Sequence, residues 1–367
     1  MQDNDRFLEY SLLDLGNNAR IKSFLKKVSD GEQVTMVFLG GSITERYNGG
    51  VDGCYGKVFT EMFGEKYTTS DKVKFRNAGL AGTDSVMGLI RVERDVLRHS
   101  PDIVFVEFAV NDSKDALHRE AYESLLLRLL QSEKKPAVVL IFVRAQEGYN
   151  CQGQMQAAGE HYQLPMLSIS DAVLRMTEEG RMLWSDYGDD YIHPHRQGNR
   201  MIADCLMNYF HQADLMPEDA EVMLPDEVLY GRTFYNMQLM DETNARSVRA
   251  GGFVPDNSVY QFPNGWCHRR EGYKEPFELQ ITARHLFLIY RESNDTNAGC
   301  AEVYIDGVRQ CILDSYKVTG WNNPALRHII SKECSEEHRI EIKMIPGDEH
   351  KEFAIAAFGY CDNCLPS

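Results

Sequence analysis

Three apolar runs in the first half of the chain constrain its fold more than any other feature of the sequence. Residues 34–39, 102–108 and 137–143 have the length of β-strands and consist largely of apolar side chains. Strands of this kind are buried on both faces, which requires helices on each side of a sheet. Segments with helical spacing lie between them, from residue 34 to about residue 210. The pattern predicts a three-layer α/β/α domain built on a parallel sheet.

The sequence pattern changes after residue 212. Residues 213–228 are acidic and contain two prolines, as expected of a linker. Short segments of alternating polarity follow, among them 277–283, 301–307 and 338–344, with turn residues between them. This is typical of an antiparallel β-sandwich. We therefore expect a first domain at 1–212 that includes a lead-in helix, a linker at 213–230 and a β-sandwich at 231–367.

Charge and hydropathy exclude several classes of partner. The formal net charge of −16 argues against a nucleic acid, which needs a basic surface. No apolar segment is long enough to cross a membrane, and the N-terminus lacks the features of a signal peptide. We expect a cytoplasmic protein whose nine cysteines are free thiols. The C-x-x-C of Cys361 and Cys364 has no second pair of ligands, so we expect no metal.

Residues suited to catalysis follow the ends of the predicted strands. Ser42 follows two glycines after the first strand, Gly82 lies in a loop after the second, and Asn111 follows the third. Asp190 and His193 are three residues apart just before the last helix of this domain. The carboxyl ends of parallel strands lie at one edge of a sheet, so these residues are expected to converge there.

Each of these residue types has a role in acyl transfer. Serine is a weak nucleophile that needs an adjacent base, for which His193 is the candidate. Asp190 would fix the tautomer of that histidine and stabilise its charged form. The oxyanion of the tetrahedral intermediate needs fixed donors, and the candidates are the N–H groups of Ser42 and Gly82 and the amide of Asn111.

With these four blocks in order, the first domain resembles the SGNH hydrolase superfamily, also called GDSL-like esterases. The matching blocks are GGSIT at Ser42, AGTD at Gly82, VND at Asn111, and DYIHP at Asp190 and His193. The resemblance covers residues 34–210 and implies the roles of nucleophile, oxyanion donors, acid and base for these positions.

The chain departs from the pattern of that superfamily at two positions. The usual GDS is GGS, and the usual glycine two residues before the asparagine is Ala109. Neither change removes a catalytic side chain. Asp186 and Asp189 also lie near His193, but the three-residue spacing of the family block favours Asp190.

Motifs of other enzyme classes are missing from the sequence. The G-x-S-x-G elbow fails because Thr44 occupies the last position. No P-loop, dinucleotide-binding fingerprint or H-E-x-x-H motif is present. We therefore expect an enzyme that needs no cofactor.

Candidate substrate contacts are Gly41, beside the nucleophile, and three tryptophans. Trp184 precedes the Asp-His block, whereas Trp266 and Trp321 lie in the β-rich domain. Those two either stack on sugar rings or fill the core of the sandwich. A catalytic domain followed by a sandwich resembles the acetyl-mannan esterases of gut bacteria, which makes the second domain carbohydrate-binding-like.

That resemblance implies a carboxylic ester hydrolase that removes O-acetyl groups from hemicellulose-derived oligosaccharides, with acetylated manno-oligosaccharides favoured. Three alternatives stay open at this point. One is a short-chain ester, lysophospholipid or thioester hydrolase of the same superfamily. The others are a carbohydrate-binding protein and a sugar O-acyltransferase. The sequence is also compatible with a homo-oligomer.

Overall fold

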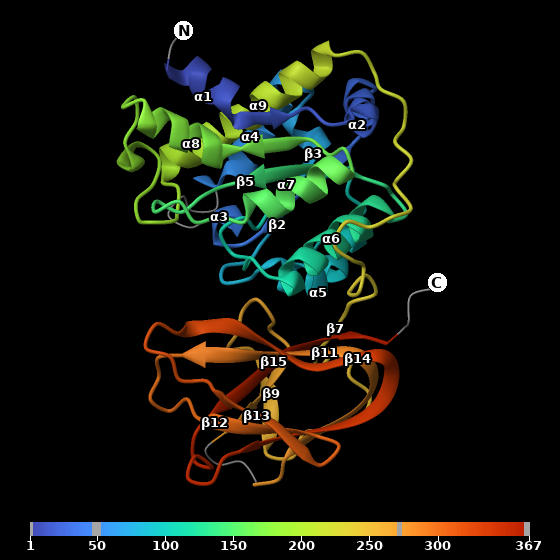
Figure 1. The fold of residues 1–367 in the computed structure, drawn as a ribbon, viewed down its shortest axis with the longest axis vertical. Helices are drawn as coiled ribbons and strands as arrows, with labels where there is room; N and C mark the ends of the chain where they lie inside the picture. The colour runs from blue at the N-terminus through green and yellow to red at the C-terminus, as the bar shows by residue number, and fades with distance from the viewer. Residues whose placement is uncertain (1–2, 46–52, 270–273, 363–367) are drawn as a thin grey trace. The chain divides into compact units, whose positions relative to one another are not determined.

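The computed structural model describes residues 3–45, 53–269 and 274–362. The chain divides into two compact units, Met1–Tyr235 and Asn236–Ser367. Figure 1 shows helices and strands in the first unit and strands in the second. In the described part of the chain, no helix has the length and apolar character needed to cross a membrane.

The first unit is built on a mixed sheet whose order is β1-β6-β5-β4-β2-β3, counted over the described residues. Neighbouring strands from β3 to β6 are parallel, as predicted, whereas β1 is antiparallel to β6. The strands are β1 (Leu12–Asp14), β2 (Val34–Gly40), β3 (Val73–Gly79), β4 (Ile103–Glu107), β5 (Ala137–Phe142) and β6 (Met166–Ser168). β2, β4 and β5 are the three apolar runs, and nearly all of their residues are buried.

Helices cover both faces of this sheet (Figure 1). One group is formed by α1, α2, α4, α8 and α9, which contact one another, and the other by α5, α6 and α7. The bounds are α1 (Asp3–Ser11), α2 (Ala19–Ser29), α3 (Ser42–Glu45), α4 (Tyr55–Tyr67), α5 (Ser85–Asp95), α6 (Ala116–Leu130), α7 (Gln152–His161), α8 (Ile169–Glu178) and α9 (Arg196–Leu215). This is the predicted three-layer α/β/α arrangement.

The N-terminal region is more structured than the sequence pattern predicted. The expected lead-in helix is α2, but α1 and the edge strand β1 precede it. Phe24 of α2 packs against Phe63 of α4 and Phe210 of α9, with ring centroids 5.7 and 6.0 Å away. β1 was missed because it has only three residues and pairs with β6, more than 150 residues further along the chain.

The register of the sheet brings the ends of three strands to one level. Gly40 at the end of β2 is paired with Gly79 of β3 on one side and with Glu107 of β4 on the other. The loops that follow these residues carry Ser42, Gly82 and Asn111, respectively. The sheet therefore delivers the three segments to the same C-terminal edge.

The last part of the first unit is held by a buried carboxylate. Glu123 of α6 accepts hydrogen bonds from the backbone N–H groups of Leu229, Tyr230 and Gly231 at 2.6, 2.6 and 2.8 Å. The hydroxyl of Tyr162 donates to the same carboxylate at 2.6 Å. The segment that follows α9 is thus attached to the first unit.

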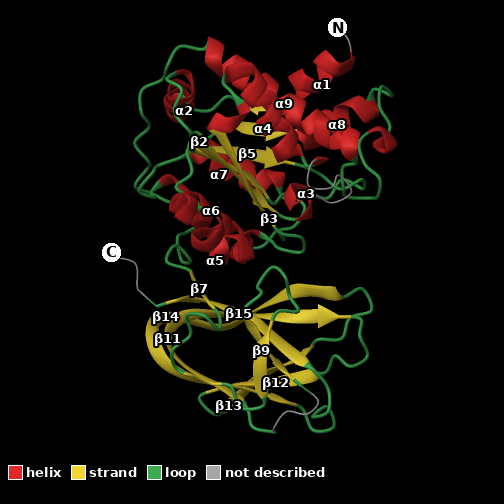
Figure 2. Ribbon diagram, turned by 180° about the vertical axis from the view of Figure 1, so that it is seen from behind, coloured by secondary structure: helices red, strands yellow, loops and turns green. Residues whose placement is uncertain are grey.

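The second unit is an antiparallel β domain, as predicted, and Figure 2 shows only strands and loops in its described part. Its main path of paired strands runs β13-β12-β14-β11-β15-β10-β9, with β7 beside β15 and β8 beside β11. The strands are β7 (Gln238–Met240), β8 (Val248–Arg249), β9 (Phe253–Asp256), β10 (Gly265–His268), β11 (Phe277–Ser293), β12 (Cys300–Ile305), β13 (Val308–Asp314), β14 (Trp321–Met344) and β15 (Phe353–Cys361).

Two strands of this unit, β11 and β14, are much longer than the short segments of alternating polarity that the sequence predicted. Residues 277–283 and 285–291 form one strand, β11, because an irregularity between Ala283 and His285 shifts the register without ending the pairing with β14. Such bulges bend a strand and increase its twist. The curved strands enclose a core that includes Trp266, Phe277 and Phe358.

Candidate active site

Ser42 lies at the point where β2 ends and the short helix α3 begins. The backbone N–H of Glu45 donates to the carbonyl of Gly41 at 3.0 Å and closes this turn. A Cβ atom at Gly40 would lie 2.2 Å from Oγ1 of Thr44, so only glycine fits there. The sequence therefore makes an abrupt turn that leaves the Ser42 side chain half-buried at the edge of the sheet.

His193 and Asp190 lie in the loop before α9 and form a hydrogen-bonded row with Ser42. Oγ of Ser42 is 2.8 Å from Nε2 of His193, and Nδ1 of His193 is 2.8 Å from Oδ2 of Asp190. Asp186, one of the competing carboxylates, instead accepts a hydrogen bond from the backbone of Leu183. The structure thus brings together the serine, histidine and aspartate that the sequence singled out.

The Asp190 carboxylate is held in its ionised form. Burial alone would raise its pKa, but backbone N–H groups of His193 and Ile192 and the imidazole of His193 donate to it and lower the pKa. Both backbone hydrogen bonds are 2.7 Å long and end on Oδ1, which leaves Oδ2 for the imidazole. An ionised Asp190 keeps a proton on Nδ1 and leaves Nε2 to accept from the serine hydroxyl.

The loop of Gly82 is tied to the end of β2. The backbone N–H of Leu80 donates to the carbonyl of Gly40 at 3.0 Å, and that of Thr83 donates to Leu80. Gly82 has a φ of 74°, a conformation that favours glycine. Its turn therefore lies beside the Ser42 turn.

The side chain of Asn111 packs directly against Gly41. A Cβ atom at Gly41 would lie 2.4 Å from Oδ1 of Asn111 and 2.8 Å from its Nδ2. Among the described residues, this Oδ1 atom is buried without a hydrogen-bond partner. The amide of Asn111 is thus adjacent to the residue that precedes Ser42, and a side chain at Gly41 would displace it.

Asp112 connects the Asn111 loop to the helix that follows Gly82. Its carboxylate accepts from the backbone N–H and the hydroxyl of Ser85, the first residue of α5. Burial, and then the nearby charge of Asp84, raise the pKa of Asp112 to about 7. The two loops that carry the candidate oxyanion donors are therefore joined by a buried pair of hydrogen bonds.

His118 adds a second link at this junction, where the Asn111 loop meets the N-terminus of α5. Asp84 and Asp115 cap the N-termini of α5 and α6, and His118 contacts both carboxylates, at 3.4 and 2.8 Å. Burial lowers the pKa of His118, but hydrogen bonds to these two carboxylates outweigh it and raise the pKa to about 9. A protonated His118 thus bridges the two caps.

The three tryptophans occupy different environments. Trp184 is half-buried, and its indole N–H donates to the backbone carbonyl of Asp190 at 2.5 Å, so it supports the loop that carries Asp190. Trp266 is only 4% exposed and belongs to the core of the second unit, which makes its expected role as a sugar contact wrong. Its strand β10 lies between β9 and β15, and the register turns the indole inward. Trp321 is 49% exposed and lies beside Tyr260, with ring centroids 6.4 Å apart.

Sequence reasoning missed the buried polar residues behind Ser42. Glu107 is fully buried, and Oγ1 of Thr44 donates to its Oε2 at 3.2 Å. Burial raises the pKa of Glu107 to about 8, against the opposing effect of the Thr44 hydrogen bond. A signal was available, because Glu107 is a carboxylate at the end of an apolar strand.

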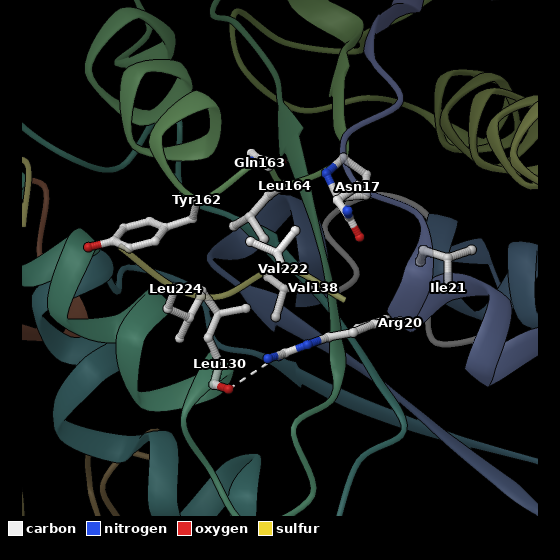
Figure 3. Close-up of a pocket in the computed structure, with 12 residues that line it drawn as sticks. Asn17, Arg20, Ile21, Leu130, Val138, Tyr162, Gln163, Leu164, Val222 and Leu224 are labelled. Atoms are coloured by element: carbon white, nitrogen blue, oxygen red, sulfur yellow. Dashed lines mark hydrogen bonds between the residues drawn. The ribbon is translucent and has the colours of Figure 1, made fainter. Parts of the chain in front are cut away.

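A separate pocket lies at the opposite edge of the sheet, near the first residue of β5 (Figure 3). Its volume is about 30 Å³, which is enough for one or two water molecules. Arg20 extends across it and donates to the carbonyls of Leu130 and Pro136. This pocket is far too small for an oligosaccharide.

Within the described residues, no three His, Cys, Asp or Glu side chains gather as metal ligands would. Cys361 is buried, whereas Cys364 lies outside the described residues.

Known proteins are similar to the segment of the chain that contains this site. The profile of the GDSL-like Lipase/Acylhydrolase family matches residues 38–201. Thioesterase 1/protease 1/lysophospholipase L1 of Escherichia coli strain K12 is 24% identical over 180 residues, which are 47% of this chain and 81% of that protein.

The similarity to solved structures extends over both units. A crystal structure of a two-domain esterase (CEX) active on acetylated mannans has a TM-score of 0.89 and 25% identity, covering 98% of this chain and 99% of that one. A second structure of that esterase, co-crystallised with mannopentaose, has a TM-score of 0.86 at 24% identity, with the same coverage, and shows the shared fold.

Fold and sequence together define the chain as a carboxylic ester hydrolase. Its first unit contains a GDSL-like lipase/acylhydrolase domain, which the profile match locates at residues 38–201.

Proposed function

We propose that the protein is a serine esterase that removes O-acetyl groups from hemicellulose-derived oligosaccharides, with acetylated manno-oligosaccharides favoured. The observation that carries the catalytic part is the hydrogen-bonded row of Ser42, His193 and Asp190. The substrate part is supported by the likeness, over both units, to an esterase active on acetylated mannans.

In the proposed mechanism, Oγ of Ser42 attacks the acetyl carbonyl while Nε2 of His193 takes its proton. The N–H groups of Ser42 and Gly82 and the amide of Asn111 stabilise the oxyanion. His193 then gives the proton to the leaving sugar oxygen. A water molecule, activated by the same imidazole, attacks the acetyl-enzyme and releases acetate.

Trp321 is the proposed sugar contact on the second unit. An exposed indole presents an apolar face, and sugar rings have apolar faces that stack on aromatic rings. Its neighbour Tyr260 is 50% exposed and extends the aromatic surface. Replacing Trp321 with alanine should raise KM for an acetylated oligosaccharide and leave KM for 4-nitrophenyl acetate unchanged. Val318→Ala, at a 79% exposed position three residues away, is the control and should change neither value.

Mass spectrometry of acetylated manno- and xylo-oligosaccharides, before and after treatment, tests the substrate directly. We expect mass losses of acetyl groups, faster on the manno-oligosaccharides, and none with Ser42→Ala. Preferential loss from the xylo-oligosaccharides would overturn the preference for manno-oligosaccharides. Acetyl groups that remain on both would overturn the assignment.

The similarity to the E. coli protein named as a thioesterase and lysophospholipase favours a second candidate, an acyl hydrolase for longer chains. Aryl esters of increasing chain length distinguish the two. The acetylesterase proposal requires that acetate esters turn over fastest. Faster turnover of hexanoate or octanoate esters would favour the second candidate.

A further inference from the structure

A chain of buried hydrogen bonds begins directly behind the nucleophile's turn. Thr44, two residues after Ser42, donates from Oγ1 to Oε2 of Glu107 at 3.2 Å. The same Oγ1 atom is 2.9 Å from the hydroxyl of Tyr55. Either hydroxyl can be the donor in this second contact. The three side chains are at most 1% exposed.

The chain continues through Asn199 to the loop of the base. The backbone N–H of Tyr55 donates to Oδ1 of Asn199 at 2.9 Å. Nδ2 of Asn199 donates to the carbonyls of Pro194 and His195, at 2.9 and 3.1 Å. Asn199 belongs to α9 and is 1% exposed. The three hydrogen bonds use its carbonyl oxygen and both of its N–H donors.

The two ends of this chain lie next to the two reacting side chains. Thr44 is two residues from Ser42, and the carbonyl of Pro194 belongs to the residue after His193. Neither neighbourhood is rigid by itself, because α3 has only four residues and His193 lies in a loop. The side chain of Asn199 is fully hydrogen-bonded in this arrangement, and another arrangement of the two segments would leave its buried polar groups unpaired.

We propose that Thr44, Tyr55 and Asn199 are positioning residues that hold the Ser42 turn and the His193 loop at their reactive separation. This inference rests on the proposed function, since it needs Ser42 as the nucleophile. The distance between Oγ of Ser42 and Nε2 of His193 is 2.8 Å, and the hydrogen bonds set the relative position of the two backbones. A misplacement of about 1 Å at a reacting group costs roughly 100-fold in rate.

Thr44→Val tests this directly, because valine keeps the shape of threonine and removes the hydroxyl. We expect kcat on 4-nitrophenyl acetate to fall about tenfold with KM within about twofold, since the change affects geometry and not binding. Thr44→Ser retains the hydroxyl and should restore most of kcat. The matched control is Thr60→Val, which deletes another buried hydroxyl, one bonded to the carbonyl of Gly56. It should leave kcat unchanged.

A second pair keeps the test decisive if Thr44→Val does not fold. Tyr55→Phe removes one hydroxyl from the chain of hydrogen bonds and should also lower kcat. Tyr209→Phe is its control, because the Tyr209 hydroxyl is buried without a hydrogen-bond partner among the described residues. Removing it should have no effect on kcat.

The rate at which an organophosphonate modifies Ser42 gives a readout of nucleophile geometry that does not depend on deacylation. Thr44→Val and Tyr55→Phe should react several-fold more slowly than their controls, and mass spectrometry should locate the adduct at Ser42. Suppose that the organophosphonate modifies Ser42 in the unsubstituted protein. If Thr44→Val and Tyr55→Phe then have the same modification rate and the same kcat as their controls, only the positioning role is overturned. An unsubstituted protein that is not modified at Ser42 would overturn the proposed function as well.

Discussion

The carboxylate of Asp112 holds the first residue of α5 by two hydrogen bonds, one from the N–H of Ser85 at 2.8 Å and one from its hydroxyl at 2.6 Å. Asp112 follows Asn111, and Ser85 follows the Gly82 loop by two residues. The relationship therefore fixes the two candidate oxyanion donors relative to each other. Oxyanion donors act because they are in place before charge develops, so their spacing decides their effect.

Asp112→Ala should consequently reduce kcat about tenfold or more, since removing one oxyanion donor outright costs about 10²–10³ in kcat. KM for small esters should change little. Steady-state kinetics on 4-nitrophenyl acetate measures both. Ser113→Ala, at the exposed neighbouring position, is the control. Equal kcat values for the two variants would show that the junction has no part in catalysis.

Asp190→Asn should reduce kcat by roughly 10³–10⁴, because an amide in this position favours the wrong histidine tautomer. The fold should persist, since the asparagine retains an oxygen for the backbone N–H groups of Ile192 and His193. Asp189→Asn, one residue away and exposed, should be nearly as active as the unsubstituted protein. Circular dichroism controls for folding, and the reverse order of activities would assign the acid to Asp189.

Gly41→Ala should lower kcat, because its Cβ would lie 2.4 Å from Oδ1 of Asn111 and would push the amide away from Ser42. Gly153→Ala is the comparison, since no atom lies within 4 Å of a Cβ at that position in α7. That second change should leave kcat intact and stabilise the helix by about 0.5–1 kcal/mol. Wild-type activity in Gly41→Ala would show that the Asn111 amide is not required where it lies.

Stability should depend on pH through Glu107. Burial raises its pKa from 4.5 to about 8, so the folded protein binds this proton more tightly than the unfolded chain. The free energy of unfolding should therefore fall as pH rises between these two values and level off above them. The slope is at most about 1.4 kcal/mol per pH unit for one group.

Glu107→Gln should remove this part of the pH dependence, which urea unfolding across the range measures. The fall that is left should come from Asp112, whose pKa is raised from 3.8 to about 7, and from His118, whose pKa is raised from 6.5 to about 9. The difference between the two profiles, which lies between pH 4.5 and about 8, therefore measures the contribution of Glu107. If the free energy of unfolding has the same pH dependence in Glu107→Gln and in the unsubstituted protein, Glu107 is ionised in the folded state.

Glu123→Gln should destabilise the first unit by about 2 kcal/mol, because hydrogen bonds to a charged acceptor contribute about 1.5–3 kcal/mol each and an amide cannot accept all four. Three of those donors are the N–H groups of residues 229–231, so this segment should become sensitive to proteases. Glu133→Gln, on the exposed surface, should change neither property. Unfolding and limited proteolysis are the two measurements.

Features encoded within short segments were predictable from the sequence. The buried strands and the residues after each strand end depend on local pattern, and the predicted α/β/α order is observed. Contacts between distant residues were not predictable in this way. Asn199 and the backbone of Tyr55 are 144 positions apart, and nothing in either segment indicates the other.

The tryptophans of the β domain show the same limit. Trp266 and Trp321 both lie in segments with strand character, yet one is buried and the other is half exposed. Pairing decides the difference, because β10 lies between two strands and Trp321 is the first residue of its own strand. A one-residue change in the pairing register of a strand would have turned its tryptophan to the opposite face of the sheet.

The position of Phe24 has a practical consequence for any truncation of this enzyme. The family profile begins at residue 38, but Phe24 of α2 fills the space between Phe63 and Phe210. A shortened chain starting at β2 would open that aromatic cluster and leave the edge of β6 without its antiparallel neighbour β1. The smallest piece able to fold alone is therefore longer at its N-terminal end than the segment by which the family is defined.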